Sequence, residues 1–386
     1  MDGVFNVAVA DFGTVGEDGI VRPSAEGRRL SSSMYAQIVD QIELDANLRD
    51  QLSRVVVWND SEGAAERNLL IGMVEGSDAA ERDQNAAALA ERLGANMVIY
   101  GYLDDTITQT RGSDLALNFY YRTPLERGEP SFTAGAMSLG RPITSTSPLQ
   151  GAGEAPLREL LDKSLRRARL LFYITAGLSW LIDDNVTEAA RALASGEADL
   201  DRWPPADIAG REVLYLYKAQ TALLERDYAA GLTAVDRALE LATDYVNAKL
   251  LKGALLLDGA QLYYVSQNVE QLTDAQRACM SDSVLAKAVQ NEEEAEANAA
   301  EAVRWLEEGV AAARDTNLPN IENQGRLSLG LAYRLMGQIA ADGKDWETAE
   351  TWLDLAGETL EEARQWFAEQ GQSQYVGWAL AGLGAT

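Results

Sequence analysis

The spacing of hydrophobic and polar residues changes character part of the way along the chain. Up to about Pro148, short apolar runs of strand length alternate with longer stretches in which apolar residues recur every three or four positions. From Leu157 onward only the helical period remains. The pattern predicts an N-terminal three-layer α/β domain over residues 4–148, a linker over 149–156, and an all-α domain over 157–386.

The first domain shows strand and helix patterns in alternation. A helix is expected after Ser24, and a second one between an Asp78 cap, with Glu81 in its first turn, and Gly94 at its end. Alternating β and α elements at these lengths predict a parallel sheet with helical crossovers, to which the last strands add an antiparallel hairpin. The strand patterns are NVAVADF, RVVVW, NMVIYGYLDD, DLALNFYYRT and SFTAGAMSLG.

The stretch VADFGTVGEDG contains a DFG tripeptide, which in protein kinases supplies a magnesium ligand. That role needs a strand lysine, a glycine-rich loop and a catalytic aspartate upstream, whereas only ten residues precede Asp11. Gly13, Gly16 and Gly19 also match neither standard phosphate-binding loop. The stretch therefore indicates a buried strand that runs into a glycine-rich turn.

In a sheet of this type the usual ligand cleft lies beyond the carboxyl ends of the parallel strands. Asp11 and Asp60 at these ends have two interpretations, either solvated turn-forming carboxylates or part of a small-ligand or cation site. The residues predicted for such a cleft are Asp11, Phe12, Trp58, Asn59 and Asp60.

Two segments of the first domain carry a resemblance to a known family. VAVADF at the start and AALAERLGANMVIYGYL, residues 87–103, resemble the two signatures of the TolB amino-terminal-like domain, although Asn96 stands where that family usually has aspartate. The resemblance implies a non-enzymatic module of envelope or signalling proteins, often placed beside helical repeats.

The second domain contains an internal repeat. Small residues such as Gly177 and Ala219 recur at matching places in helix pairs whose second helices begin at Val186 and Tyr228, an offset of 42 residues. A fourth repeat carries Trp346, Ala349, Leu353 and Ala356 at its small and large positions, and an insertion at about 259–290 interrupts the third. This frame resembles the tetratricopeptide repeat (TPR), which implies an α-solenoid of helix pairs.

The TPR resemblance implies a groove lined by the first helix of each repeat, suited to a protein or peptide partner. The lysine and asparagine pattern that grips a chaperone's C-terminal carboxylate is not present, which argues against that ligand. Burial of these positions against the insertion or the first domain is the alternative interpretation. The predicted groove residues are Leu216, Tyr217, Gln220, Asn247, Leu250, Leu327, Leu331 and Arg334.

Composition narrows the classes of function. A formal net charge of -27 disfavours nucleic acid and anionic lipid as partners. Histidine is absent, which removes serine and cysteine triads and histidine-containing zinc sites, so neither a metal nor a cofactor is expected. The single cysteine, Cys279, leaves open whether the chain is cytoplasmic or an extracytoplasmic part of a membrane-anchored parent.

These observations favour a non-enzymatic scaffold that recruits a protein or peptide partner through a TPR groove. The alternative hypothesis is a sensory or regulatory segment of a larger signalling or defence protein, with a small ligand bound at the α/β domain. An acid-base enzyme that uses Asp11 and Asp60 is a third and more remote hypothesis.

Overall fold

The computed structural model describes residues 4–44, 55–60, 70–105, 112–122, 132–147, 149, 154–201, 209–267 and 291–384. The chain divides into two compact units. The first comprises residues 1–125 and 133–217, and the second comprises 126–132 and 218–386. The division thus falls between Tyr217 and Lys218, well beyond the linker predicted at 149–156, since two further helices group with the sheet. Part of that linker and residues 268–290 of the predicted insertion lie outside the described residues.

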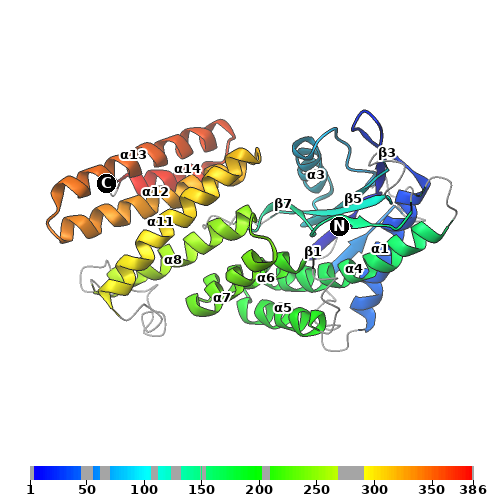
Figure 1. Ribbon diagram of the computed structural model, residues 1–386, viewed down its shortest axis with the longest axis horizontal. Helices are drawn as coiled ribbons and strands as arrows, with labels where there is room; N and C mark the ends of the chain where they lie inside the picture. Colours follow the sequence, from blue (N-terminus) through cyan, green and yellow to red (C-terminus); the bar gives the residue numbers. More distant parts are fainter. Residues whose placement is uncertain are drawn as a thin grey trace. The chain divides into compact units, whose positions relative to one another are not determined.

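The sheet of the first unit has the predicted mixture of parallel and antiparallel pairing (Figure 1). Strand β1 (Phe5–Val9) pairs in parallel with β4 (Val55–Trp58) and with β5 (Met97–Asp104). On the other side of β5, β6 (Asp114–Tyr121) runs antiparallel and pairs in turn with β7 (Gly135–Ser138) and β8 (Ile143–Thr144). A short hairpin of β2 (Gly13–Val15) and β3 (Val21–Pro23) lies in the segment predicted to be only a turn.

Helix α3 (Ala79–Leu93) begins and ends at the residues that the sequence predicts. The Asp78 carboxylate accepts the Glu81 amide at 2.9 Å, while the Glu81 carboxylate accepts the Ser77 amide at 2.7 Å. Gly94 ends the helix in the left-handed region at φ 62°. The predicted helix after Ser24 is α1 (Ala25–Leu44).

Helices cover both faces of the sheet. On one face, α3 packs against Ala8, Val98 and Tyr100. The other face is covered by α1 and by α4 (Ala155–Ile182), which pack against each other, and α4 reaches β5 where Thr175 lies 3.6 Å from the Met97 sulfur. Helix α5 (Val186–Leu200) packs on α4. These contacts explain why α4 belongs to the first unit.

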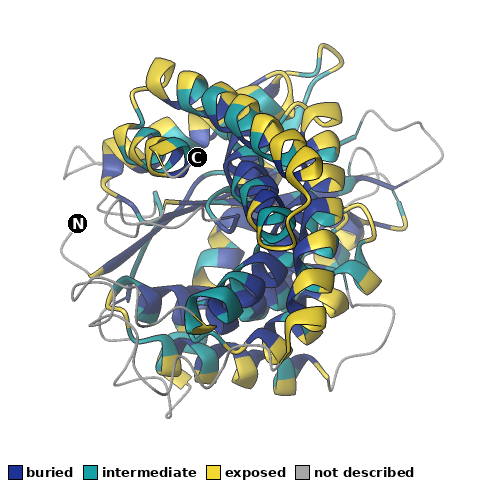
Figure 2. Cartoon of the chain, turned by 90° about the vertical axis from the view of Figure 1, so that its left-hand side faces the viewer, coloured by how far each residue is buried: buried dark blue, intermediate teal, exposed yellow. Residues whose placement is uncertain are grey.

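The second unit is helical, and each of its described helices packs against the next (Figure 1). Along α7, α11 and α13 one side is buried and the opposite side is exposed, whereas α8 and α12 are mostly buried, as the colours of Figure 2 indicate. Helix α6 (Arg211–Leu224) begins in the first unit and ends in the second. The remaining helices are α7 (Tyr228–Leu241), α8 (Val246–Gln267), α11 (Glu292–Asp315), α12 (Pro319–Asp342), α13 (Trp346–Glu369) and α14 (Ser373–Gly384).

One turn geometry joins helices at five places. In each, a residue adopts the left-handed conformation and the next amide donates to the carbonyl five residues earlier, as Asp345 does to Ala340 at 2.9 Å. The left-handed residues are Asp184, Arg226, Asn317, Lys344 and Gly371. The following Asn185, Asp227 and Asp345 then cap the next helix with their side chains. The same local chemistry therefore reverses the chain repeatedly.

Neighbouring helices approach closely because glycine on one helix faces leucine on the other. A Cβ atom placed on any of these glycines would lie between 2.5 and 2.8 Å from the facing leucine side chain. The pairs are Gly177 with Leu193, Gly253 with Leu306, Gly309 with Leu250, Gly330 with Leu360, and Gly337 with Leu353.

We predict that Gly330→Ala destabilises the protein by about 1–2 kcal/mol, although alanine is the better helix former. The added methyl would lie 2.6 Å from Cγ of Leu360, which is fully buried and has no room to move. The matched control is Gly357→Ala on α13, where nothing lies within 4 Å and about 0.5–1 kcal/mol of stabilisation is expected. Urea denaturation measures the change in the free energy of unfolding of each variant, which should fall for Gly330→Ala and rise for Gly357→Ala. Stabilisation by Gly330→Ala would contradict the close approach of α12 and α13.

Candidate functional site

The structure places Asp11 and Asp60 at the same edge of the sheet. Asp11 follows β1 and Asp60 follows β4, and these strands are parallel neighbours with Ala8 opposite Trp58. Phe12 is fully buried, whereas Trp58 is partly buried against the cluster beneath α3. Asn59 is half-buried. Of the predicted cleft residues, Phe12 and Trp58 therefore act in packing, and the two carboxylates remain as candidates for ligand chemistry.

The Asp60 carboxylate is engaged by the backbone. Its two oxygens accept the amides of Ile71 at 2.7 Å and Gly72 at 2.6 Å. Gly72 has a φ of 74°, a conformation that favours glycine. Asp60 thereby holds the segment that crosses the ends of the strands.

Asp11 is bound to the same segment through its backbone, while its side chain is less constrained. Its amide donates to the Gly72 carbonyl at 2.9 Å, whereas among the described residues its carboxylate accepts a single long contact, from the Ser31 hydroxyl at 3.5 Å. Burial and the nearby charge of Asp60 raise the pKa of Asp11, and Arg28 and Ser31 oppose this shift. A half-buried carboxylate with spare acceptor capacity remains at the edge.

The chemistry open to this edge is hydrogen-bond acceptance by one carboxylate. The first turn of α1 is partly satisfied internally, because the Gly27 amide donates to the Ser24 hydroxyl at 3.0 Å. Within the part of the chain that the structure describes, no three histidine, cysteine, aspartate or glutamate side chains are grouped so as to hold a metal ion.

Most of the predicted groove residues lie inside their own units rather than on a surface. Leu216, Tyr217, Gln220, Asn247, Leu250 and Leu327 are all buried. The Tyr217 hydroxyl donates to the Thr133 carbonyl at 2.9 Å, and the Asn247 amide donates to the Phe132 carbonyl at 2.6 Å. These side chains are committed to internal contacts.

Leu331 and Arg334 are half-buried and face α14. Leu331 belongs to the apolar cluster that joins α12, α13 and α14, and the Arg334 guanidinium donates to the Gly382 carbonyl at 3.3 Å. Burial lowers the pKa of Arg334. Neither side chain lines an open groove.

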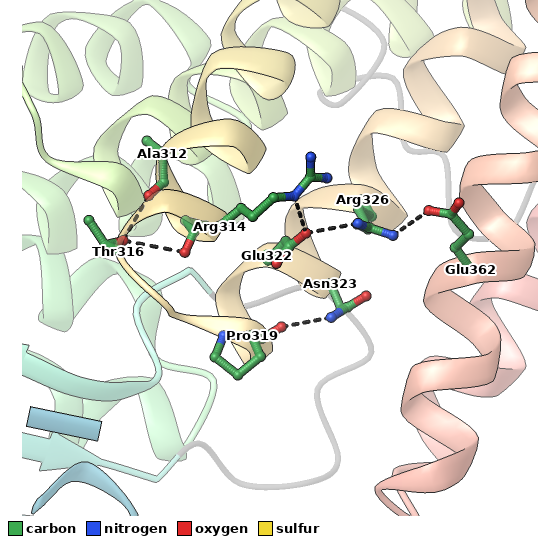
Figure 3. Close-up of polar contacts among 9 residues, drawn as sticks. Ala312, Arg314, Thr316, Pro319, Glu322, Asn323, Arg326 and Glu362 are labelled. Atoms are coloured by element: carbon green, nitrogen blue, oxygen red, sulfur yellow. Dashed lines mark hydrogen bonds and ion pairs between the residues drawn. The ribbon is translucent and has the colours of Figure 1, made fainter. Parts of the chain in front are cut away.

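An ion-pair network that sequence analysis missed ties α11, α12 and α13 together (Figure 3). Glu322 on α12 accepts from Arg314 at 3.0 Å and from Arg326 at 2.8 Å, and Arg326 also pairs with Glu362 of α13. Glu322 and Arg326 have the i, i+4 spacing of one helix, but Arg314 and Glu362 lie on the neighbouring helices, so helical periodicity alone could not identify the links between helices. The arginines of this network are used within the fold.

The outer side of α13 combines carboxylates with exposed apolar side chains. We call this surface the α13 outer face and define it by Trp346, Glu347, Glu350, Asp354, Leu355, Glu358 and Glu362, all exposed. Trp346 is 68% exposed and Leu355 is 38% exposed. The expectation that Trp346 fills a packing position of the repeat is wrong, because it is the first residue of α13 and projects outside the helix contact.

Comparison of the chain with protein-family models, with curated proteins and with solved structures finds no match. Among the described helices, none combines the length and the low polarity that a membrane crossing requires.

We predict that Asp11→Asn and Asp60→Asn have opposite effects on stability at pH 7. Asp11 has a raised folded-state pKa, so its stabilising contribution is complete below pH 3.8 and is lost as the pH rises through the raised value. Asp11→Asn should consequently be more stable than the native chain at pH 7, and this advantage should vanish near pH 3.8. Asp60→Asn should cost about 2 kcal/mol because one charge-assisted bond to a backbone amide is lost.

Urea titrations of both variants at the two pH values provide the measurement. Equal destabilisation by the two substitutions at pH 7 would show that the carboxylates have the same structural task, contrary to the geometry.

Proposed function

We propose that this chain is a non-catalytic interaction protein, whose helical unit is an α-solenoid of the TPR type that recruits a protein partner. The observation that carries the proposal is the α13 outer face, where Trp346 and Leu355 are exposed among carboxylates. Tryptophan contributes disproportionately to binding energy at protein interfaces. Its exposure in an acidic surface has no evident role in folding.

The repeated architecture supports this proposal. Identical left-handed turns and glycine–leucine contacts recur from α4 to α14, as in proteins built from stacked helix pairs. Such a stack buries each helix against its neighbours and leaves an outer side free along its length. Binding is assigned to the α13 outer face because the positions first expected to line a groove are buried.

The charge of this face defines the chemistry of the partner. Five carboxylates share the surface of α13 with the two apolar side chains, namely Glu347, Glu350, Asp354, Glu358 and Glu362, and Glu362 also pairs with Arg326. A basic, amphipathic segment would meet both the acidic and the apolar parts. Its association should weaken at high salt, which screens exposed charges.

The test uses the full chain immobilised in a lysate of its source organism, with retained proteins identified by mass spectrometry and their affinities measured by calorimetry. Trp346→Ala combined with Leu355→Ser should weaken binding of the partner by at least about tenfold. Leu165→Ser is the control, since Leu165 on α4 is also exposed, at 43%. Retention of the same partner with unchanged affinity by the double variant would contradict the proposal.

A second candidate function is recognition of a small ligand by the α/β unit, as part of a sensory or regulatory protein. The spare acceptor capacity of the half-buried Asp11 carboxylate favours it. A library of small cationic and hydroxylated metabolites, screened by thermal shift against the native chain and Asp11→Asn, tests this function. A shift that is equal in both proteins would exclude Asp11 as the recognition group.

A further inference from the structure

Helix α14 presents an outer side unlike that of any other described helix. It is the one helix among the described residues that contains no charged side chain. Leu380 on this side is 52% exposed. We call the surface the α14 face and define it by Ser373, Gly377, Leu380, Ala381 and Gly384, all exposed.

The spacing within the α14 face is that of a helix-pairing seam. Ser373, Gly377, Leu380 and Gly384 follow one another at intervals of four, three and four residues. This alternation keeps one stripe facing a partner helix in left-handed helix pairs. The stripe is therefore in position to receive a second helix.

The neighbouring helix α12 shows how such a stripe is covered in this protein. Gly330 and Gly337, seven residues apart on α12, receive Leu360 and Leu353 of the antiparallel α13. Gly377 and Gly384 on α14 have the same spacing, but no atom of the described residues lies within 4 Å of a Cβ placed on either. The small positions that hold a leucine elsewhere in the unit are open here.

We infer that the α14 face pairs with the α14 face of a second copy of this chain, antiparallel and around a two-fold axis. In that arrangement Leu380 lies opposite Gly377 of the second copy, and Gly377 lies opposite the second copy's Leu380. Ser373 and Gly384 become opposite one another in the same register. The face is thus complementary to itself, which an isologous dimer requires.

Charge favours a second copy at this surface and not at others. Two chains with a formal net charge of -27 repel each other wherever their acidic surfaces meet. Because α14 has no charged side chain, its own residues bring no carboxylate into a contact between two copies. A basic partner, in contrast, would gain nothing from the uncharged α14 face and would favour the α13 outer face.

The size of the α14 face limits the affinity that two copies can have for each other. A helix of 12 residues is about 18 Å long, so the contact is smaller than that of most stable dimers. Tyr375, Val376 and Trp378 are half-buried on α14 and pack against the cluster shared with α12 and α13, so Leu380 supplies most of the apolar area of the seam. The pairing is therefore a weak, concentration-dependent equilibrium.

Sedimentation velocity of the full chain between about 1 and 200 μM tests the inference. The native chain should pass from monomer to dimer, whereas Leu380→Asp should weaken dimerisation at least about tenfold because a carboxylate would be buried without a partner. Leu165→Asp on α4, an exposed leucine outside both faces, is the matched control and should dimerise like the native chain. A chain that is monomeric throughout, or a dimer unaffected by Leu380→Asp, would overturn the inference.

A second variant separates loss of pairing from loss of folding. Gly377→Glu improves helix propensity at an open position, so it should leave the circular dichroism spectrum unchanged while it abolishes the dimer. A Gly377→Glu chain that is folded and still dimerises would place the interface elsewhere.

Cysteine cross-linking tests the register. In a Cys279→Ser background, a mixture of Gly377→Cys and Leu380→Cys chains should form the mixed disulfide faster than either symmetric one. Preferential formation of the symmetric disulfides would indicate parallel pairing and overturn the antiparallel arrangement.

If α14 instead captures a different protein while the chain stays monomeric, the partner is not a second copy. Neither result would alter the expected effect of Trp346 and Leu355 on partner capture, so the two proposals fail separately.

Discussion

The close approach of successive helices is the constraint on which the helical part of this protein depends. A glycine without a side chain lets a leucine of the next helix enter its surface, and this contact recurs from Gly177 to Gly337. Because a Cβ atom would collide with that leucine, the spacing of the helices is fixed by sequence at each crossing. The outer sides of the helices take no part in these contacts, which leaves them free to differ in chemistry.

The sequence predicts much of the fold because the responsible signals are local. The cap residues Asp78 and Gly94 act within one helical turn, so α3 is found at its predicted place. The β2–β3 hairpin was missed because strands of three residues within a glycine-rich turn carry no period. The unit boundary differs because α4 is apolar on all sides from residue 170 onward, and periodicity does not tell which partner covers that part.

The candidate site was only partly predictable for a related reason. Asp11 and Asp60 are placed together by parallel strand order, which the sequence reveals. What distinguishes them is the segment at Ile71 and Gly72. Its amides donate one hydrogen bond to each oxygen of Asp60, whereas the Asp11 carboxylate receives the long contact from Ser31. That distinction depends on tertiary structure. Similarly, an apolar period marks Tyr217 and Leu250 as inward-facing on a helix without telling a groove from an interior.

Charge separates the two outer surfaces at the end of the helical unit. The α13 outer face gathers carboxylates around Trp346 and Leu355, whereas α14 has no charged residue. Added salt screens attraction between the α13 outer face and a basic partner, and so weakens that association. The same salt screens the general repulsion between two acidic chains, and so strengthens pairing through the α14 face. Higher ionic strength should thus weaken binding at the α13 outer face and strengthen pairing through the α14 face, because charge attracts the partner in the first case and repels it in the second.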